Sequence, residues 1–241
     1  MHSLQETYQA QIEELVRASN RLAQIGFVTS QGGNLSYRVA EDVILITPTK
    51  VAKGSIQFDD ICAVNLKGEV LYASEGRRPT GEWPFHTRIF AHRPDIKGIV
   101  HAHPPSLTGF AIAGGDWMAK PFLPEPAIEV GPMIMVPYAE PLSEELAQKF
   151  DAVIEKSNGF LMENHGALMC SGEGVYRALE FLEMREAMGK SILVAKVLGN
   201  PKVIPMADVM NLERVIKIRE MPMPGLKGVV NSLSDCFVTE E

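Results

Sequence analysis

Hydrophobic residues near the N-terminus recur at every third or fourth position, which is the spacing of one helix face. Between residues 4 and 25 the repeating positions are Tyr8, Ile12, Leu15, Val16, Leu22 and Ile25. This period predicts an amphipathic helix, and Gly26 is well placed to end it. Helical spacing also predicts helices over residues 82–92, 106–113, 143–156, 175–198 and 207–219.

Short apolar or alternating runs between these helices predict β-strands. They cover residues 35–39, 43–47, 61–66, 69–72, 98–103, 134–136, 160–162 and 167–170. Lys67 and Gly68 lie between two of these runs and predict a two-residue hairpin turn. The residues from 221 onward show no clear period.

Helices on both sides of a block of strands, several joined by hairpin-like turns, favour a mixed sheet covered by helices. Regular strand–helix alternation and a GxGxxG motif are both missing, which argues against a parallel dinucleotide-binding sheet. The 241 residues contain no repeat and no linker. We therefore predict one α/β domain over residues 1–241, with a mixed or antiparallel central sheet covered by helices.

Composition and charge narrow the possible partners. A hydrophobic fraction of 46% argues against disorder, and a net charge of -7 argues against nucleic acid as a partner. No apolar run reaches the length of a membrane span, and the N-terminus has no secretory pattern. Three dispersed cysteines favour a reducing compartment. We expect a cytoplasmic protein that binds neither nucleic acid nor a membrane.

Histidines provide the most informative chemistry. His101 and His103 stand two apart in a predicted strand, so both imidazoles project to one face, where they can chelate a metal such as zinc or lie in solvent. His165 precedes Gly166 at a sharp turn between two short strands. Three protein ligands with one open position are typical of a catalytic metal site. His86 and His92 lie on a predicted helix, where a surface or packing role is the more common one.

Other polar positions allow two interpretations each. Glu82 begins a predicted helix, where a carboxylate either complements the helix N-terminus or acts as a general acid/base beside a metal. Two loops are rich in backbone N–H groups and hydroxyls, and they form either ordinary turns or an anion cradle. They cover residues 32–34 and 47–50.

In order and spacing these pieces resemble the class II aldolase/adducin family, from about residue 10 to 199. The resemblance rests on Gly33-Asn34-Leu35-Ser36, Ile46-Thr47-Pro48-Thr49, Glu82 with His86, His101-Ala102-His103, Pro137-Tyr138 and Asn164-His165-Gly166. The resemblance implies the family's fold, which is a single α/β domain with three α/β/α layers and a central mixed, mostly antiparallel sheet. Residues 200–241 form an extension to which the resemblance assigns no role.

The resemblance implies a set of site residues. The implied ligands of a divalent metal, zinc with manganese or cobalt as alternatives, are His101, His103 and His165. Glu82 is implied as the catalytic acid/base. A substrate phosphate is expected near Asn34, Thr49, Lys50, Thr80 and Gly81. Family members are commonly homotetramers with active sites at subunit interfaces, and we expect the same here.

The implied activity is metal-dependent retro-aldol cleavage of a phosphorylated ketose, such as L-fuculose 1-phosphate, to dihydroxyacetone phosphate and an aldehyde. The alternative is decarboxylation of an oxo-sugar-acid phosphate, which Lys50 supports by offering a cation to a carboxylate. Dehydratases and epimerases of the family use the same metal chemistry. A non-catalytic, adducin-like scaffold is the remote alternative. Such proteins are expected to lose the metal histidines, whereas this chain keeps all three.

The sequence also departs from the family pattern. The aldolases carry two serines before the acid, where this chain has Thr80 and Gly81, and a glycine where it has Lys50. The related 4-epimerases have an aspartate at the position of Glu82. A tyrosine that fuculose-phosphate aldolases receive from a neighbouring subunit has no match in the segment 123–126.

Overall fold

The computed structural model of the chain describes residues 4–237, and its centre is one eight-stranded sheet with the order β4-β3-β2-β1-β5-β8-β7-β6. Neighbouring strands are antiparallel except β6 and β7, which are parallel. The predicted mixed, mostly antiparallel sheet is therefore confirmed. The strands are β1 (Asn34–Ala40), β2 (Val43–Ile46), β3 (Cys62–Val64), β4 (Val70–Tyr72), β5 (Gly98–Ala102), β6 (Met133–Val136), β7 (Gly159–Met162) and β8 (Gly166–Ser171).

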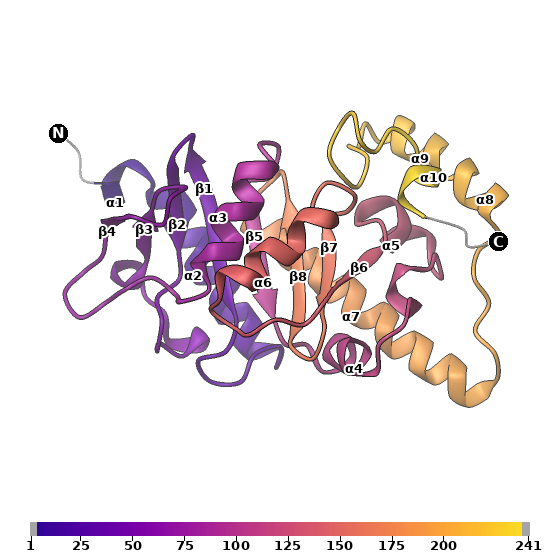
Figure 1. Ribbon diagram of the computed structural model, residues 1–241, viewed down its shortest axis with the longest axis horizontal. Helices are drawn as coiled ribbons and strands as arrows, with labels where there is room; N and C mark the ends of the chain where they lie inside the picture. The colour runs from indigo at the N-terminus through magenta and orange to yellow at the C-terminus, as the bar shows by residue number, and fades with distance from the viewer. Residues whose placement is uncertain (1–3, 238–241) are drawn as a thin grey trace.

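Helices cover both faces of this sheet (Figure 1). One layer contains α3 and α6, and the opposite layer contains α2, α4 and α7. The three-layer α/β/α architecture is thus confirmed. The helices are α1 (Leu4–Thr7), α2 (Gln9–Gln24), α3 (Trp83–His92), α4 (Pro105–Ala113), α5 (Pro124–Glu129), α6 (Glu144–Lys149), α7 (Val175–Leu198), α8 (Met206–Asn211), α9 (Glu213–Ile218) and α10 (Leu233–Cys236).

Strand β2 is apolar on both faces because each face packs against helices. In β2, Ile44 and Ile46 point into the cluster beneath α3 and α6, whereas Leu45 points into the cluster beneath α2 and α7. All three side chains are fully buried. This explains why the sequence shows continuous apolar runs in place of strict alternation.

Several predicted boundaries are wrong. The N-terminal helix is interrupted at Tyr8, and the helix that begins after Ser143 becomes a single 3-10 turn after Lys149. The Ser143 hydroxyl accepts the N–H of Leu146, as expected of an N-cap. The segment 207–219 forms two helices that meet at Leu212. Apolar spacing continues across these interruptions, so periodicity alone could not reveal them.

The hairpin between β3 and β4 is longer than predicted. Its connection runs from residue 65 to 69, and the side-chain oxygen of Asn65 accepts the N–H groups of Lys67 and Glu69. The Asn65 N–H also donates to the Glu69 carbonyl at 3.0 Å, so backbone pairing continues to both ends of this connection. Gly68 takes a positive φ of 80°, which suits glycine.

The C-terminal extension packs onto α5, a helix that the sequence pattern did not predict. Figure 1 shows α8, α9 and α10 grouped at the end of the molecule beside α5. Ala127 and Ile128 of α5 share an apolar cluster with Val209, Ile216 and Leu233 of the extension. Proline near the start of α5 obscured this helix, although proline is well tolerated in a first turn.

Two further observations concern the predicted environment. Among residues 4–237, no helix is both long enough and apolar enough to cross a membrane. The three cysteines, Cys62, Cys170 and Cys236, are buried free thiols. Burial raises the pKa of Cys170 and of Cys236 to about 12, so neither thiol is a reactive group at neutral pH.

Replacing Gly98 with alanine is expected to destabilise the protein by about 3 kcal/mol, because strand β5 passes closely under the start of α7. A Cβ atom at Gly98 would lie 2.2 Å from the carbonyl carbon of Gly174. Urea unfolding measures the effect. Gly109→Ala is the matched control, because Gly109 lies in α4 with open space around it and should gain up to about 1 kcal/mol. Equal unfolding midpoints for the two variants would contradict this packing argument.

Candidate metal centre and active site

The sheet brings three histidines together at the edge where β5 ends and β8 begins. His101 lies in β5, His103 follows that strand directly, and His165 occupies the turn between β7 and β8. The distances between ring centroids are 4.9 Å for His101–His103, 4.8 Å for His101–His165 and 5.4 Å for His103–His165. One nitrogen from each ring lies within 4.8 Å of the others. Three imidazoles at this spacing can surround one divalent cation.

The chemistry of these rings fits a metal. The Nδ1 atom of His101 lies 3.0 Å from the Ala167 carbonyl oxygen, to which it can only donate, so its Nε2 keeps a free lone pair. Each of the three rings has one buried nitrogen without a hydrogen-bond partner. These atoms are the Nε2 of His101, the Nε2 of His103 and the Nδ1 of His165. Burial lowers the pKa of His103 to about 4 and holds that of His101 well below its usual range. Both rings are therefore neutral, as metal ligands must be.

Glycines allow the backbone to approach this cluster. A Cβ atom at Gly166 would lie 2.5 Å from the His103 ring, and one at Gly32 would lie 3.1 Å from its Nδ1. Asn164, which precedes His165, has a positive φ of 53°. The Asn-His-Gly turn is thus shaped to direct His165 toward the other two rings.

Glu82 is the acidic residue beside the cluster. It is the N-cap of α3, but its side chain makes no capping hydrogen bond with that helix. Its Oε1 lies 3.4 Å from the Nε2 of His165, and its Oε2 lies 3.6 Å from the Nε2 of His101. Oε2 also accepts a 2.6 Å hydrogen bond from the side-chain amide of Asn34. This orientation favours a role at the cluster over one at the helix terminus.

The residues expected near a phosphate come from two segments that lie side by side. The N–H of Thr49 donates to the Arg78 carbonyl, and the N–H of Thr80 donates to the Thr47 carbonyl, each at 3.0 Å. The Thr80 hydroxyl accepts the N–H of Glu82 at 3.3 Å, which joins these segments to the acid.

Other members of this predicted phosphate set lie at the surface. Lys50 and Gly81 are exposed, and Lys50 has a positive φ of 60°, which explains why glycine suits this position. Asn34 is buried against Glu82. Phosphate binding by these residues stays a prediction.

Sequence reasoning missed two residues near the site. For His86 the sequence predicts a surface or packing role, and the ring is fully buried; its hydrogen bonds to Asn34 and Ser36 were not predicted. Its position one helical turn after Glu82 was the available signal. Lys53 is 1% exposed, and its ammonium donates to the carbonyls of Gln31 and Val51. No pattern in the sequence marks Lys53.

Lys53 places a cation beside the candidate metal centre. Burial lowers its pKa to about 8, and the negative charge of Glu82 opposes part of that decrease. Its own charge in turn helps to lower the pKa of His103. Because both groups interact with it, the ammonium contributes positive charge to the site.

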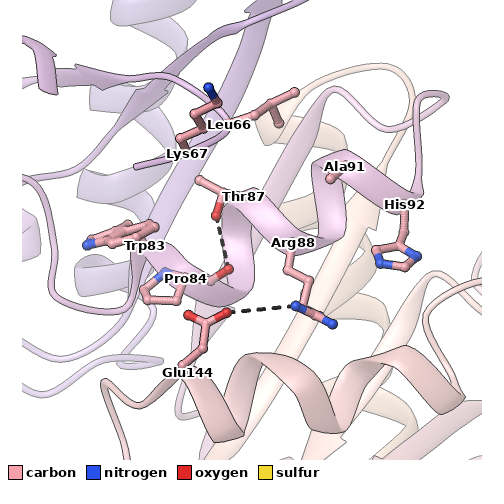
Figure 2. Close-up of a pocket in the computed structure, with 9 residues that line it drawn as sticks. All are labelled: Leu66, Lys67, Trp83, Pro84, Thr87, Arg88, Ala91, His92 and Glu144. Atoms are coloured by element: carbon pink, nitrogen blue, oxygen red, sulfur yellow. Dashed lines mark hydrogen bonds and ion pairs between the residues drawn. The ribbon is translucent and has the colours of Figure 1, made fainter. Parts of the chain in front are cut away.

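A separate cavity of about 340 Å³ lies on the outer face of α3 (Figure 2). Trp83, Thr87, Arg88 and His92 line it from α3, and Glu144 of α6 closes one side. None of the three clustered histidines lines this cavity. It is therefore distinct from the candidate metal centre.

Stability of the metal-free protein is expected to fall as the pH falls from 6.5 toward 3, partly through His86. Burial lowers its pKa to about 3, whereas an unfolded histidine has a pKa near 6.5. Within this window the unfolded state binds the extra proton, so acid favours unfolding by about 1.4 kcal/mol per pH unit for this residue. Urea unfolding at pH 7, 5.5 and 4.5 measures the slope. His86→Gln should show a shallower slope, and an unchanged slope would contradict the assignment.

Comparison with known proteins agrees with this geometry. The family model described as Class II Aldolase and Adducin N-terminal domain matches residues 13–192. A 3-oxo-tetronate 4-phosphate decarboxylase from Pectobacterium atrosepticum is 30% identical, over 79% of this chain and 85% of its own length. Two solved structures have TM-scores of 0.79. YgbL from Escherichia coli, described as a putative aldolase/epimerase/decarboxylase, is 25% identical over 86% of this chain and 99% of its own. An L-fuculose 1-phosphate aldolase is 26% identical over 90% of this chain and 98% of its own.

Proposed function

Because this chain belongs to the class II aldolase and adducin family, we propose that it is a metal-dependent lyase that decarboxylates a 3-oxo-sugar-acid phosphate. The observation that carries the proposal is the position of the Glu82 carboxylate, which lies 3.6 Å from His101 and 3.4 Å from His165 in a cluster of three imidazoles. The similarity to 3-oxo-tetronate 4-phosphate decarboxylases supports the class of substrate.

We propose zinc as the metal because three imidazoles suit it, with manganese or cobalt as alternatives. His101, His103 and His165 would hold it. When bound, it would polarise the substrate carbonyl as a Lewis acid. The homotetramer and the placement of active sites between subunits stay predictions.

The reaction asks for one proton at one carbon. Breaking the bond between the carboxylate carbon and C2 releases carbon dioxide and leaves the electron pair on C2, conjugated with the C3 carbonyl. Delivery of a proton to C2 by Glu82 then gives dihydroxyacetone phosphate, and water returns a proton to Glu82. Glu82 is 8% exposed, so it delivers this proton from a largely dry position.

Charge at the site also favours an acidic substrate. A 3-oxo-sugar-acid phosphate carries a carboxylate in addition to its phosphate. The Lys53 ammonium is buried and donates to the backbone carbonyls of Gln31 and Val51. Besides interacting with Glu82, its positive charge lowers the free energy of an anionic substrate group nearby. The suggested carboxylate contact of the exposed Lys50 stays a prediction.

Retro-aldol cleavage of a ketose 1-phosphate is the second candidate, supported by the similarity to L-fuculose 1-phosphate aldolase. It produces the same enediolate, because breaking the C3–C4 bond leaves the electron pair on C3 beside the C2 carbonyl. It also needs a group to take the proton of the departing hydroxyl. The tyrosine that fuculose-phosphate aldolases receive from a neighbouring subunit is a candidate for this group. The corresponding segment here is Leu123-Pro124-Glu125-Pro126, which has no tyrosine, and this favours decarboxylation.

A substrate panel separates the two candidates. Metal-reconstituted protein is assayed with 3-oxo-tetronate 4-phosphates for carbon dioxide and with ketose 1-phosphates for aldehyde, each with and without a chelator. We expect chelator-sensitive carbon dioxide release. Aldehyde release alone would establish the second candidate. Neither product from a protein that holds one metal ion would contradict the proposed reaction class.

A further inference from the structure

His86 belongs to a hydrogen-bonded chain that ends on Glu82. Its Nδ1 lies 2.6 Å from the Ser36 hydroxyl oxygen, and its Nε2 lies 2.5 Å from the side-chain oxygen of Asn34. The Asn34 amide nitrogen lies 2.6 Å from the Oε2 of Glu82. All four side chains are buried, with exposures from 0% to 8%. Solvent therefore competes little with any of these bonds.

The direction of each bond follows from the groups involved. The side-chain oxygen of Asn34 can only accept, so the Nε2 of His86 must carry the ring proton. Because burial lowers the pKa of His86 to about 3, the ring is neutral and its Nδ1 accepts from Ser36. The amide of Asn34 is then fixed with its NH2 group toward Glu82, where it donates to Oε2.

We propose that His86 is a positioning residue, which acts through Asn34 to hold the Glu82 carboxylate against the histidine cluster. This inference rests on the proposed function of Glu82 as the acid/base. His86 does not touch the cluster through a hydrogen bond; it sets the orientation of the amide that does touch the acid. Oε1 of Glu82 remains on the side of His165, at 3.4 Å from its Nε2.

The surroundings of His86 show why orientation depends on it. The ring is fully buried and stacks on Phe85, with centroids 4.7 Å apart. No other side chain is hydrogen-bonded to the Asn34 oxygen in the part of the chain that the structure describes. Without the ring proton, the amide loses the group that distinguishes its oxygen end from its nitrogen end. An inverted amide would direct its oxygen at the carboxylate, and the two acceptors would repel.

Three substitutions separate positioning from packing. Glutamine can place an N–H near the position of Nε2, asparagine reaches only as far as Nδ1, and leucine has no donor. We expect His86→Leu and His86→Asn to lower kcat by about 10–100-fold with KM and metal content little changed, the size of effect usual for residues that orient a catalytic site. His86→Gln should recover kcat to within about fivefold. His92→Leu, on the exposed end of the same helix, is the matched control.

A double-mutant cycle tests the route through Asn34. If His86 acts through Asn34, adding His86→Leu to the Asn34→Ala variant should lower kcat by less than about twofold. Independent, multiplied losses would overturn the proposal. So would equal losses in the leucine, asparagine and glutamine variants with lowered unfolding midpoints, because that pattern indicates packing alone.

A measurement without turnover keeps this inference separate from the proposed reaction. In ¹⁵N-histidine NMR of the wild-type protein, His86 should remain neutral with its proton on Nε2 between pH 5 and 7.5, and Asn34→Ala should shift that Nε2 signal. A charged ring, or a proton on Nδ1, would overturn the hydrogen-bonded chain even if the enzyme is active. If the spectrum is as expected but the protein is inactive on every substrate, the proposed function is wrong and the hydrogen-bonded chain stands.

Discussion

Replacing His103 with alanine is expected to remove the bound metal and to lower turnover by at least about 1,000-fold. Three imidazoles surround the candidate site, and its ligand nitrogens lie within 4.8 Å of one another. Two rings cannot replace three, so the metal is lost on dialysis. The Lewis-acid stabilisation lost with it is worth several kcal/mol, and about 4 kcal/mol corresponds to this change in rate. Elemental analysis and kcat on the preferred substrate measure the two effects together.

His92→Ala is the control for this experiment. His92 is the last residue of α3, the helix that Glu82 precedes; its side chain is 41% exposed and lies 3.8 Å from the carboxylate of Asp151. It should keep both metal and turnover. A His103→Ala protein that is metal-free and fully active would contradict the assignment of the site.

Replacing Glu82 with glutamine is expected to lower kcat by about 10²–10⁴-fold while the metal stays bound. Glutamine has nearly the same shape, and its oxygen can still accept the Asn34 amide, but it cannot deliver a proton. The three imidazoles are unchanged, so metal content should equal that of the wild type. Steady-state kinetics with parallel elemental analysis measures both quantities.

The matched control is Glu145→Gln, at an exposed carboxylate that pairs with Lys149 on α6. Its turnover should be that of the wild type. Turnover by Glu82→Gln within about threefold of the wild type would restore the interpretation of Glu82 as a helix-terminus carboxylate. Loss of metal in that variant would make the carboxylate a ligand.

The sheet and its histidines could be predicted because their signals are local. His101 and His103 stand two apart in a strand, and β5 lies beside β8, whose preceding turn carries His165. The two-residue spacing fixes a common face. Spacing alone could not show that His165 joins these two rings, and the family resemblance implied that set of three ligands.

The missed parts of the site depend on contacts between distant residues. His86 is separated by 52 positions from Asn34 and by 50 from Ser36, and nothing in helical spacing identifies a buried histidine partner. Lys53 is held by backbone carbonyls, which leave no mark on the sequence. Buried polar groups are satisfied through tertiary structure, so their partners cannot be derived from a local pattern.

The C-terminal extension illustrates a different limit. Its apolar residues, such as Val209 and Leu233, pack onto Ala127 and Ile128 of α5. Because short helices gain most of their stability from such packing, a segment without a long period can still be ordered. The apolar repeat over residues 207–219 predicts one helix, but the structure has two helices, α8 and α9, that meet at Leu212.

Decarboxylation and retro-aldol cleavage both form the enediolate of dihydroxyacetone phosphate. The most direct test of the proposed site is therefore whether the protein forms this enediolate. Metal-loaded protein is incubated with dihydroxyacetone phosphate in D₂O, and exchange of a hydroxymethyl proton is followed by NMR. We expect exchange that a chelator abolishes and that Glu82→Gln slows by about 10²–10⁴-fold. No exchange by wild-type protein that holds its metal would contradict the account.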